Sequence, residues 1–114
     1  MEIKTDDYSI CYDPLTETVS CEGSLRLSGI EEYAPIVKLL NDLADREPEK
    51  IILNLQKLEF LNSSGINVLS KYVIKVRQKG TIQMVVKGSK SIPWQAKSLK
   101  NLQRLMPSLQ LELQ

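Results

Sequence analysis

The residues from Lys50 to Gly80 read KIILNLQKLEFLNSSGINVLSKYVIKVRQKG. This stretch opens with a nearly continuous apolar run, Ile51–Leu55. The shortness of this run and its polar flanks favour a central strand covered on both faces. Further along, aliphatic residues recur at helical spacing: Ile66, Leu69, Val73 and Val76. A Lys-Gly pair then provides a typical helix stop, so the stretch predicts a strand followed by an amphipathic helix.

Upstream of this stretch, the sequence predicts two strands and a helix. YSICYD and ETVSCEG lie on either side of a turn at Asp13-Pro14, as in a β-hairpin. SGIE, Ser28–Glu31, has the spacing of a helix capping box. It precedes a helical stripe of apolar residues: Ile36, Leu39, Leu40 and Leu43. Pro35 is therefore expected in the first turn of that helix, where its missing N–H costs no hydrogen bond.

Downstream, the same reasoning predicts a strand at TIQMVV, a helix from Pro93 to Met106 and a last strand at LQLEL. The predicted order is β-β-α-β-α-β-α-β. Alternation of strands with helices indicates the α/β class. We therefore expect residues 1–114 to form a single domain with a mixed, partly parallel β-sheet and about three α-helices packed on it.

Composition narrows the possible kinds of protein. A length of 114 residues suits one compact domain, and 42% hydrophobic with 25% charged residues is typical of a folded chain. No apolar run is long enough to span a bilayer. The polar, acidic start MEIKTDDYSI shows no secretory signal, which predicts a cytoplasmic protein.

The two cysteines are expected to be reduced and structural. With Asp13–Thr16 as the hairpin turn, Cys11 lies opposite Thr18 and Cys21 lies opposite Tyr8. Side chains alternate between the faces of a strand, so the two sulfur atoms point to opposite sides of the sheet. The chain contains no histidine, and two cysteines alone do not make a metal site. We therefore expect neither a disulfide nor a bound metal.

Charge is distributed unevenly along the chain. Residues 1–60 contain thirteen acids and six bases, whereas residues 61–114 contain one acid and nine bases. The bases of the second half are Lys71, Lys75, Arg77, Lys79, Lys87, Lys90, Lys97, Lys100 and Arg104. Either the two halves fold against each other and neutralise part of this charge, or they form a basic surface for an anionic partner.

The segment LNSSGIN, residues 61–67, joins the predicted central strand to the helix. A glycine in the first helical turn costs about 1 kcal/mol relative to alanine, so Gly65 calls for a physical reason. Ser63 and Ser64 either cap the helix or provide a seat for a phosphate, because helix N-terminal amides favour negative charge. Gly65 would leave room for a partner protein to approach. No general base is identifiable near the serines, so we expect no enzymatic activity.

These residues carry a family resemblance. The Lys50–Gly80 stretch resembles the centre of STAS domains, the family of bacterial anti-anti-sigma factors. In that family a strand leads into Asp-Ser-Ser-Gly or Asp-Ser-Thr-Gly and then into an amphipathic helix that ends at a glycine. The family's phosphorylated serine matches Ser63, and the next two residues match Ser64 and Gly65. Asn62 replaces the family's aspartate, which keeps its size and hydrogen-bonding capacity but removes its charge.

The resemblance implies a phosphorylation-regulated switch similar to an anti-sigma factor antagonist. The unmodified chain would sequester an anti-sigma factor or serine kinase-like protein, and a cognate phosphatase would reverse the modification. Ser63 is the expected phosphorylation site, with Ser64 less favoured. The kinase brings its own ATP and magnesium, so this chain is expected to need no cofactor. The expected partner-binding residues lie in two segments: Ser28, Gly29 and Glu31, and Asn62, Ser63, Ser64, Gly65 and Asn67.

Two other interpretations remain open. The same fold would serve as a scaffold that is never phosphorylated. Alternatively, the basic half would bind nucleic acid or another anionic surface weakly. Only Tyr72 and Trp94 interleave with the bases, both are expected to face inward, and no nucleic-acid motif is present. The favoured interpretation therefore has a protein partner and neither nucleic acid nor membrane.

Overall fold

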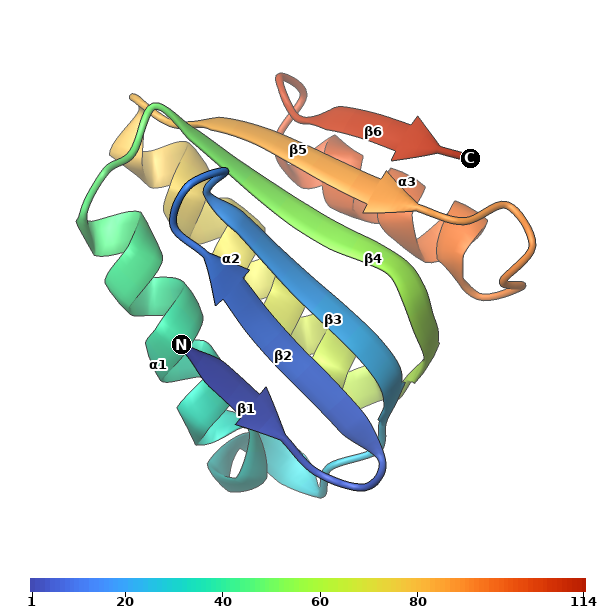
Figure 1. Cartoon of the computed structure of the whole chain (residues 1–114). Coiled ribbons are helices and arrows are strands. Elements are labelled where there is room, and N and C mark those ends of the chain that lie inside the picture. The colour runs from blue at the N-terminus through green and yellow to red at the C-terminus, as the bar shows by residue number, and fades with distance from the viewer.

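The computed structural model describes residues 1–114 and contains six strands and three helices (Figure 1). The strands are β1 (Glu2–Lys4), β2 (Tyr8–Asp13), β3 (Thr18–Leu25), β4 (Lys50–Leu61), β5 (Gln83–Gly88) and β6 (Gln110–Leu113). The helices are α1 (Gly29–Asp45), α2 (Ser63–Lys79) and α3 (Gln95–Leu105). None of the helices is long and apolar enough to cross a membrane.

All six strands form one sheet, and they lie side by side in chain order. The β1–β2 and β2–β3 pairs are antiparallel, whereas the β3–β4, β4–β5 and β5–β6 pairs are parallel. Each parallel connection passes through a helix, and the three helices lie on one face of the sheet (Figure 1). The predicted mixed sheet with three helices is confirmed. Sequence analysis missed β1, a three-residue edge strand too short to show a periodic pattern.

The central strand β4 differs from its prediction. Ile51, Leu53 and Leu55 are fully buried against the helices. Ile52 and Asn54 alternate with them on the opposite face and stay partly exposed. The prediction that both faces are covered is therefore wrong, because every helix packs on the same side. A nearly continuous apolar run does not show whether one or both faces of the strand are covered, because coverage depends on where the helices pack.

The start of α1 also corrects the sequence analysis. The Ser28 side chain makes no capping hydrogen bond, and the backbone N–H of Ser28 donates to Oε2 of Glu32 at 2.8 Å. The predicted capping box with Glu31 therefore does not form. Gly29 begins the helix with a φ of +77°, a conformation that favours glycine. Pro35 lies inside the helix rather than in its first turn, so it removes one internal helical hydrogen bond.

The hairpin forms with a register two residues away from the predicted one. Cys11 pairs with Ser20, and Cys21 pairs with Ile10, rather than with Thr18 and Tyr8. A shift of two preserves the alternation of faces, so the prediction that the two sulfur atoms lie on opposite sides of the sheet is confirmed: Cys11 is exposed and Cys21 is buried. Burial raises the pKa of the Cys21 thiol to about 12.

The start of α3 is held by a buried glutamine. Gln95 is fully buried, and its Oε1 accepts a hydrogen bond of 2.7 Å from the Ser89 N–H. Its Nε2 donates to the carbonyl oxygens of Leu55 and Leu58, at 2.6 and 3.0 Å. The helix begins at Gln95 rather than at the predicted Pro93. The role of Gln95 was not predicted, because a single glutamine in an amphipathic helical pattern looks the same in sequence as a solvent-exposed glutamine.

Candidate functional site

Asn62 organises the junction between β4 and α2. It is the N-cap of α2, and its Oδ1 accepts hydrogen bonds from the Gly65 N–H at 2.9 Å and from the Tyr33 hydroxyl at 2.7 Å. Its Nδ2 donates to the carbonyl oxygen of Leu27 at 2.8 Å. One side chain therefore joins the start of α2 to α1 and to the segment that precedes α1.

The amide nitrogen of Asn62 explains why asparagine suits this position. An ionised aspartate has two acceptors and no donor, so it would leave the Leu27 carbonyl without this partner. It would also bring negative charge to within hydrogen-bonding distance of a carbonyl oxygen. In the STAS sequence pattern, the loss of charge is the evident difference at this position. In the structure, the Nδ2 group of Asn62 acts as a hydrogen-bond donor to Leu27, and the sequence pattern did not reveal this contact.

The two serines are left free by this arrangement. Ser63 is exposed and Ser64 is partly exposed at the first two positions of α2. Asn62 does the capping that sequence analysis considered for the serines, and neither serine hydroxyl bonds to another group of the chain. The Ser63 hydroxyl is therefore exposed at a helix N-terminus, where amides and the helix dipole favour a negatively charged group.

Gly65 has an internal role. It is buried in the first turn of α2, and a Cβ atom placed on it would lie 2.7 Å from the Tyr33 hydroxyl oxygen. The same Cβ would overlap the side chain of Leu61. The expectation that Gly65 leaves room for a partner protein is corrected, because the space beside its Cα is filled by the protein's own side chains.

The second predicted segment lies next to the serines. The Asn62 N–H donates to the Leu25 carbonyl at 3.2 Å, and the Leu27 bond adds a further link to the same segment. Ser28, Gly29 and Glu31 follow directly and are exposed. The structure therefore brings together the two segments that sequence analysis predicted separately.

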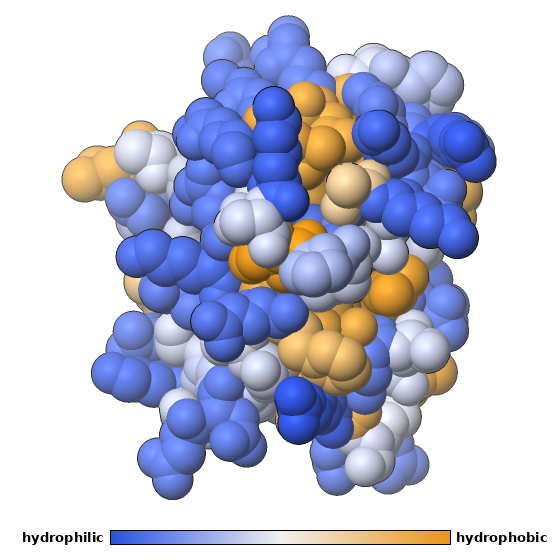
Figure 2. Space-filling view, turned by 90° about the vertical axis from the view of Figure 1, so that its right-hand side faces the viewer, coloured by the Kyte–Doolittle hydropathy of each residue, from blue (hydrophilic) through white to orange (hydrophobic).

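Two large hydrophobic side chains are exposed close to this junction in the chain. Ile30 lies in the first turn of α1 between Gly29 and Glu31, and Phe60 lies on β4 two residues before Asn62, on the face of the sheet that carries no helix. The Arg26 guanidinium lies over the Phe60 ring, 4.7 Å from its centroid. Figure 2 views the side of the molecule that lies on the right in Figure 1 and shows hydrophobic patches between hydrophilic ones. Sequence analysis did not select either side chain, because exposure is not visible in the sequence.

Comparison with protein families identifies the fold. The STAS domain model matches residues 25–106, which include α1, β4, α2, β5 and α3. The chain belongs to the STAS domain family. No curated protein matches the chain significantly.

Solved structures share the STAS fold of this chain at low sequence identity. SiaC of Pseudomonas aeruginosa superposes with a TM-score of 0.71 and 14% identity, covering 98% of this chain and 93% of SiaC. A second match is the structure of the diguanylate cyclase SiaD in complex with its activator SiaC from Pseudomonas aeruginosa. It has a TM-score of 0.74 and 13% identity, covering 100% of this chain and 99% of the matched chain. At these identities the likeness concerns the fold.

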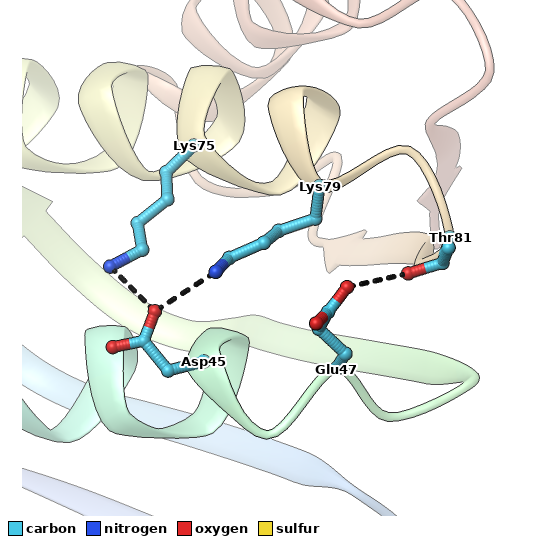
Figure 3. Close-up of polar contacts among 5 residues, drawn as sticks. All are labelled: Asp45, Glu47, Lys75, Lys79 and Thr81. Carbon is cyan, nitrogen blue, oxygen red and sulfur yellow. Dashed lines mark hydrogen bonds and ion pairs between the residues drawn. The ribbon is translucent and has the colours of Figure 1, made fainter.

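The charges of this STAS domain are partly neutralised across its helices. Asp45, in the last turn of α1, pairs with Lys75 at 3.0 Å and with Lys79 at 3.2 Å (Figure 3). These two hydrogen bonds lower the pKa of the Asp45 carboxyl. Beside them, Glu47 accepts a hydrogen bond from Thr81. Two of the nine bases of the second half therefore already have an acidic partner from the first half.

No metal-binding or nucleophilic constellation accompanies the serines. No group of three or more His, Cys, Asp or Glu side chains lies close enough to hold a metal ion. The Asn62 side chain, which precedes the serines in sequence, is occupied as acceptor and donor. What the arrangement offers is an exposed hydroxyl at a helix N-terminus with the exposed Ile30 on the neighbouring segment, which is suited to binding and modification.

Proposed function

We propose that this STAS domain is a regulatory protein that binds a partner at the end where α2 begins, and that phosphorylation of Ser63 controls the binding. The observation that carries the proposal is the free hydroxyl of Ser63. Asn62 caps the helix in its place, so modification of Ser63 removes no hydrogen bond that holds the fold.

Phosphorylation would change this surface without unfolding it. A phosphate on Ser63 adds nearly two negative charges, which the N-terminal amides and dipole of α2 tolerate. In a complex, the same group would be buried near the exposed side chain of Ile30. Removing such a charge from water without compensation is costly, so the modified chain is expected to release its partner.

The proposed partner is an anti-sigma factor or a serine kinase-like protein, with a cognate phosphatase restoring the unmodified chain. The chain acts by binding and provides only the acceptor hydroxyl. A second candidate comes from the likeness to SiaC, which is described as the activator of the diguanylate cyclase SiaD. In that case the partner is a nucleotide cyclase that the chain activates. A third alternative is a STAS scaffold that is never phosphorylated.

Intact-mass analysis and peptide mapping of the protein from its native cells test the modification. We expect a single phosphate on Ser63. Affinity capture with Ser63→Ala and Ser63→Asp tests its effect, and Ser64→Ala serves as the matched control. Ser63→Ala and Ser64→Ala should retain the partner, whereas Ser63→Asp should weaken its capture. Phosphate on Ser64 alone, or on neither serine under any growth condition, would favour the scaffold. The captured protein itself distinguishes an anti-sigma factor from a cyclase.

A further inference from the structure

A groove runs between α1 and α2, and Ser64 lines one end of it. Its volume is about 500 Å³. Ser64 and Asn67 lie at the end that adjoins the site proposed above, and Lys75 lies at the other end. Lys75 follows Ser64 by eleven positions along α2, which corresponds to a length of roughly 16 Å.

The floor of the groove is apolar. Val37 and Leu40 from α1 and Val68 from α2 line it, and the exposed Ile30 extends it toward the serines. Ligand and peptide grooves commonly combine an apolar floor of this kind with a few polar groups at the rim. The groove is therefore suited to an apolar ridge on a binding partner.

The charge of the groove has one sign. Lys71 and Lys75 are the only charged residues that line it. Lys75 is held by Asp45 at the far end (Figure 3), whereas Lys71 is exposed and has no ion pair within the chain. A partner that fills the groove would meet an unpaired positive charge halfway along it, and acidic side chains complement that charge.

We propose that this groove binds an acidic amphipathic helix of the partner protein. The inference rests on the proposed function, whose binding site it extends. About three turns of a partner helix match the length of the groove, with apolar residues at every third or fourth position facing Val37, Leu40 and Val68. Acidic residues beside this ridge pair with Lys71.

The proposed helix also gives the switch a physical basis. Ser64 lies at the mouth of the groove and Ser63 is its neighbour. A phosphate on Ser63 would place negative charge next to an acidic helix and repel it. The repulsion acts mainly on acidic residues at the end of the partner helix that lies beside the serines, and added salt screens it. Phosphorylation should therefore weaken binding of the partner helix, and added salt should weaken binding of the unmodified chain by screening Lys71.

Photo-crosslinking of the full chain in its native cells tests the occupant. A benzoylphenylalanine replaces Asn41, which lines the groove from α1, and a second replaces the exposed Gln110 on β6 as the control. We expect the probe at Asn41 to form an adduct with an acidic, amphipathic helical segment of another protein, and the probe at Gln110 to form none with that segment. A lipid adduct, an adduct with a second copy of this chain, or no adduct at Asn41 would overturn the proposal.

Binding of the crosslinked segment, made as a synthetic peptide, tests the chemistry. Lys71→Glu should weaken binding about tenfold or more, whereas Lys97→Glu, the same charge reversal at an exposed position of α3, should change it less than about twofold. Ile30→Asp should also weaken binding, with the highly exposed Leu15→Asp as its control. Both positions are exposed, so folding is preserved. Equal effects of Lys71→Glu and Lys97→Glu would overturn the assignment to the groove.

The two proposals fail in different ways. A partner released by phosphorylation of Ser63 but insensitive to Lys71→Glu would preserve the switch and exclude the groove. An adduct at Asn41 with Ser63 never phosphorylated would preserve the groove and exclude the switch.

Discussion

Replacing Gly65 with alanine is expected to destabilise this protein, although alanine is the better helix former. An interior glycine-to-alanine change in a helix typically gains up to about 1 kcal/mol. Here the added Cβ would lie 2.7 Å from the Tyr33 hydroxyl oxygen and would overlap the Leu61 side chain. Overpacking of this kind costs about 1–3 kcal/mol.

A second cost arises from the hydrogen bond that Tyr33 makes. Its hydroxyl donates to Asn62 at 2.7 Å, and moving it away from the new methyl group would lengthen or break this bond, at a cost of about 1 kcal/mol. After subtraction of the helix-propensity gain, we expect Gly65→Ala to lower the free energy of unfolding by about 1–3 kcal/mol. In urea, the midpoint of unfolding should fall by about 1 M.

Urea unfolding followed by far-UV circular dichroism measures this effect. Asn67→Ala, an exposed position two residues further along the same helix, is the matched control and should be neutral or stabilising by up to about 0.7 kcal/mol. Adding Tyr33→Phe removes the hydroxyl that the Cβ meets, so the cost of Gly65→Ala should be about 1 kcal/mol smaller in that background. A Gly65→Ala variant as stable as the wild type would refute the argument, since it would show that Tyr33 and Leu61 adjust freely.

Three further predictions concern the junction, the cysteines and the helix ends. Asn62→Asp removes the donor to the Leu27 carbonyl and gains only a favourable dipole interaction, so urea unfolding at pH 7 should show a loss of about 1 kcal/mol; an unchanged midpoint would mean that the donor is dispensable. A thiol reagent at pH 8 should label Cys11 alone in the folded protein, because burial raises the pKa of Cys21 to about 12, and should label both after unfolding; rapid labelling of both in the native state would contradict this burial. The pKa of Asp45 is lower in the folded state, so its contribution to stability is present above the pKa of an unfolded aspartate and is lost as pH falls through the folded value. Asp45→Asn should therefore flatten the dependence of stability on pH below about 4, and an unchanged acid profile would show that the pairing with two lysines has no effect.

The sequence alone determined the class of the fold and the approximate position of most elements. The helical stripe of α2, the glycine that ends it and the apolar run of β4 depend on residues close together in the chain. Local periodicity records them for that reason. The segment from residue 62 to 65 was located in the same way, because strand, cap and helix follow one another directly.

The contacts of those residues depend on the folded structure. Gly65 packs against Tyr33, and Asn62 donates to Leu27, a residue 35 positions earlier in the chain. The uncovered face of β4 and the groove between α1 and α2 likewise depend on where helices dock. Such contacts join residues that are far apart in the chain, so no periodic pattern in the sequence predicts them. Their geometry follows from how the buried faces of α1, α2 and β4 fit together, and that fit exists only once the chain has folded.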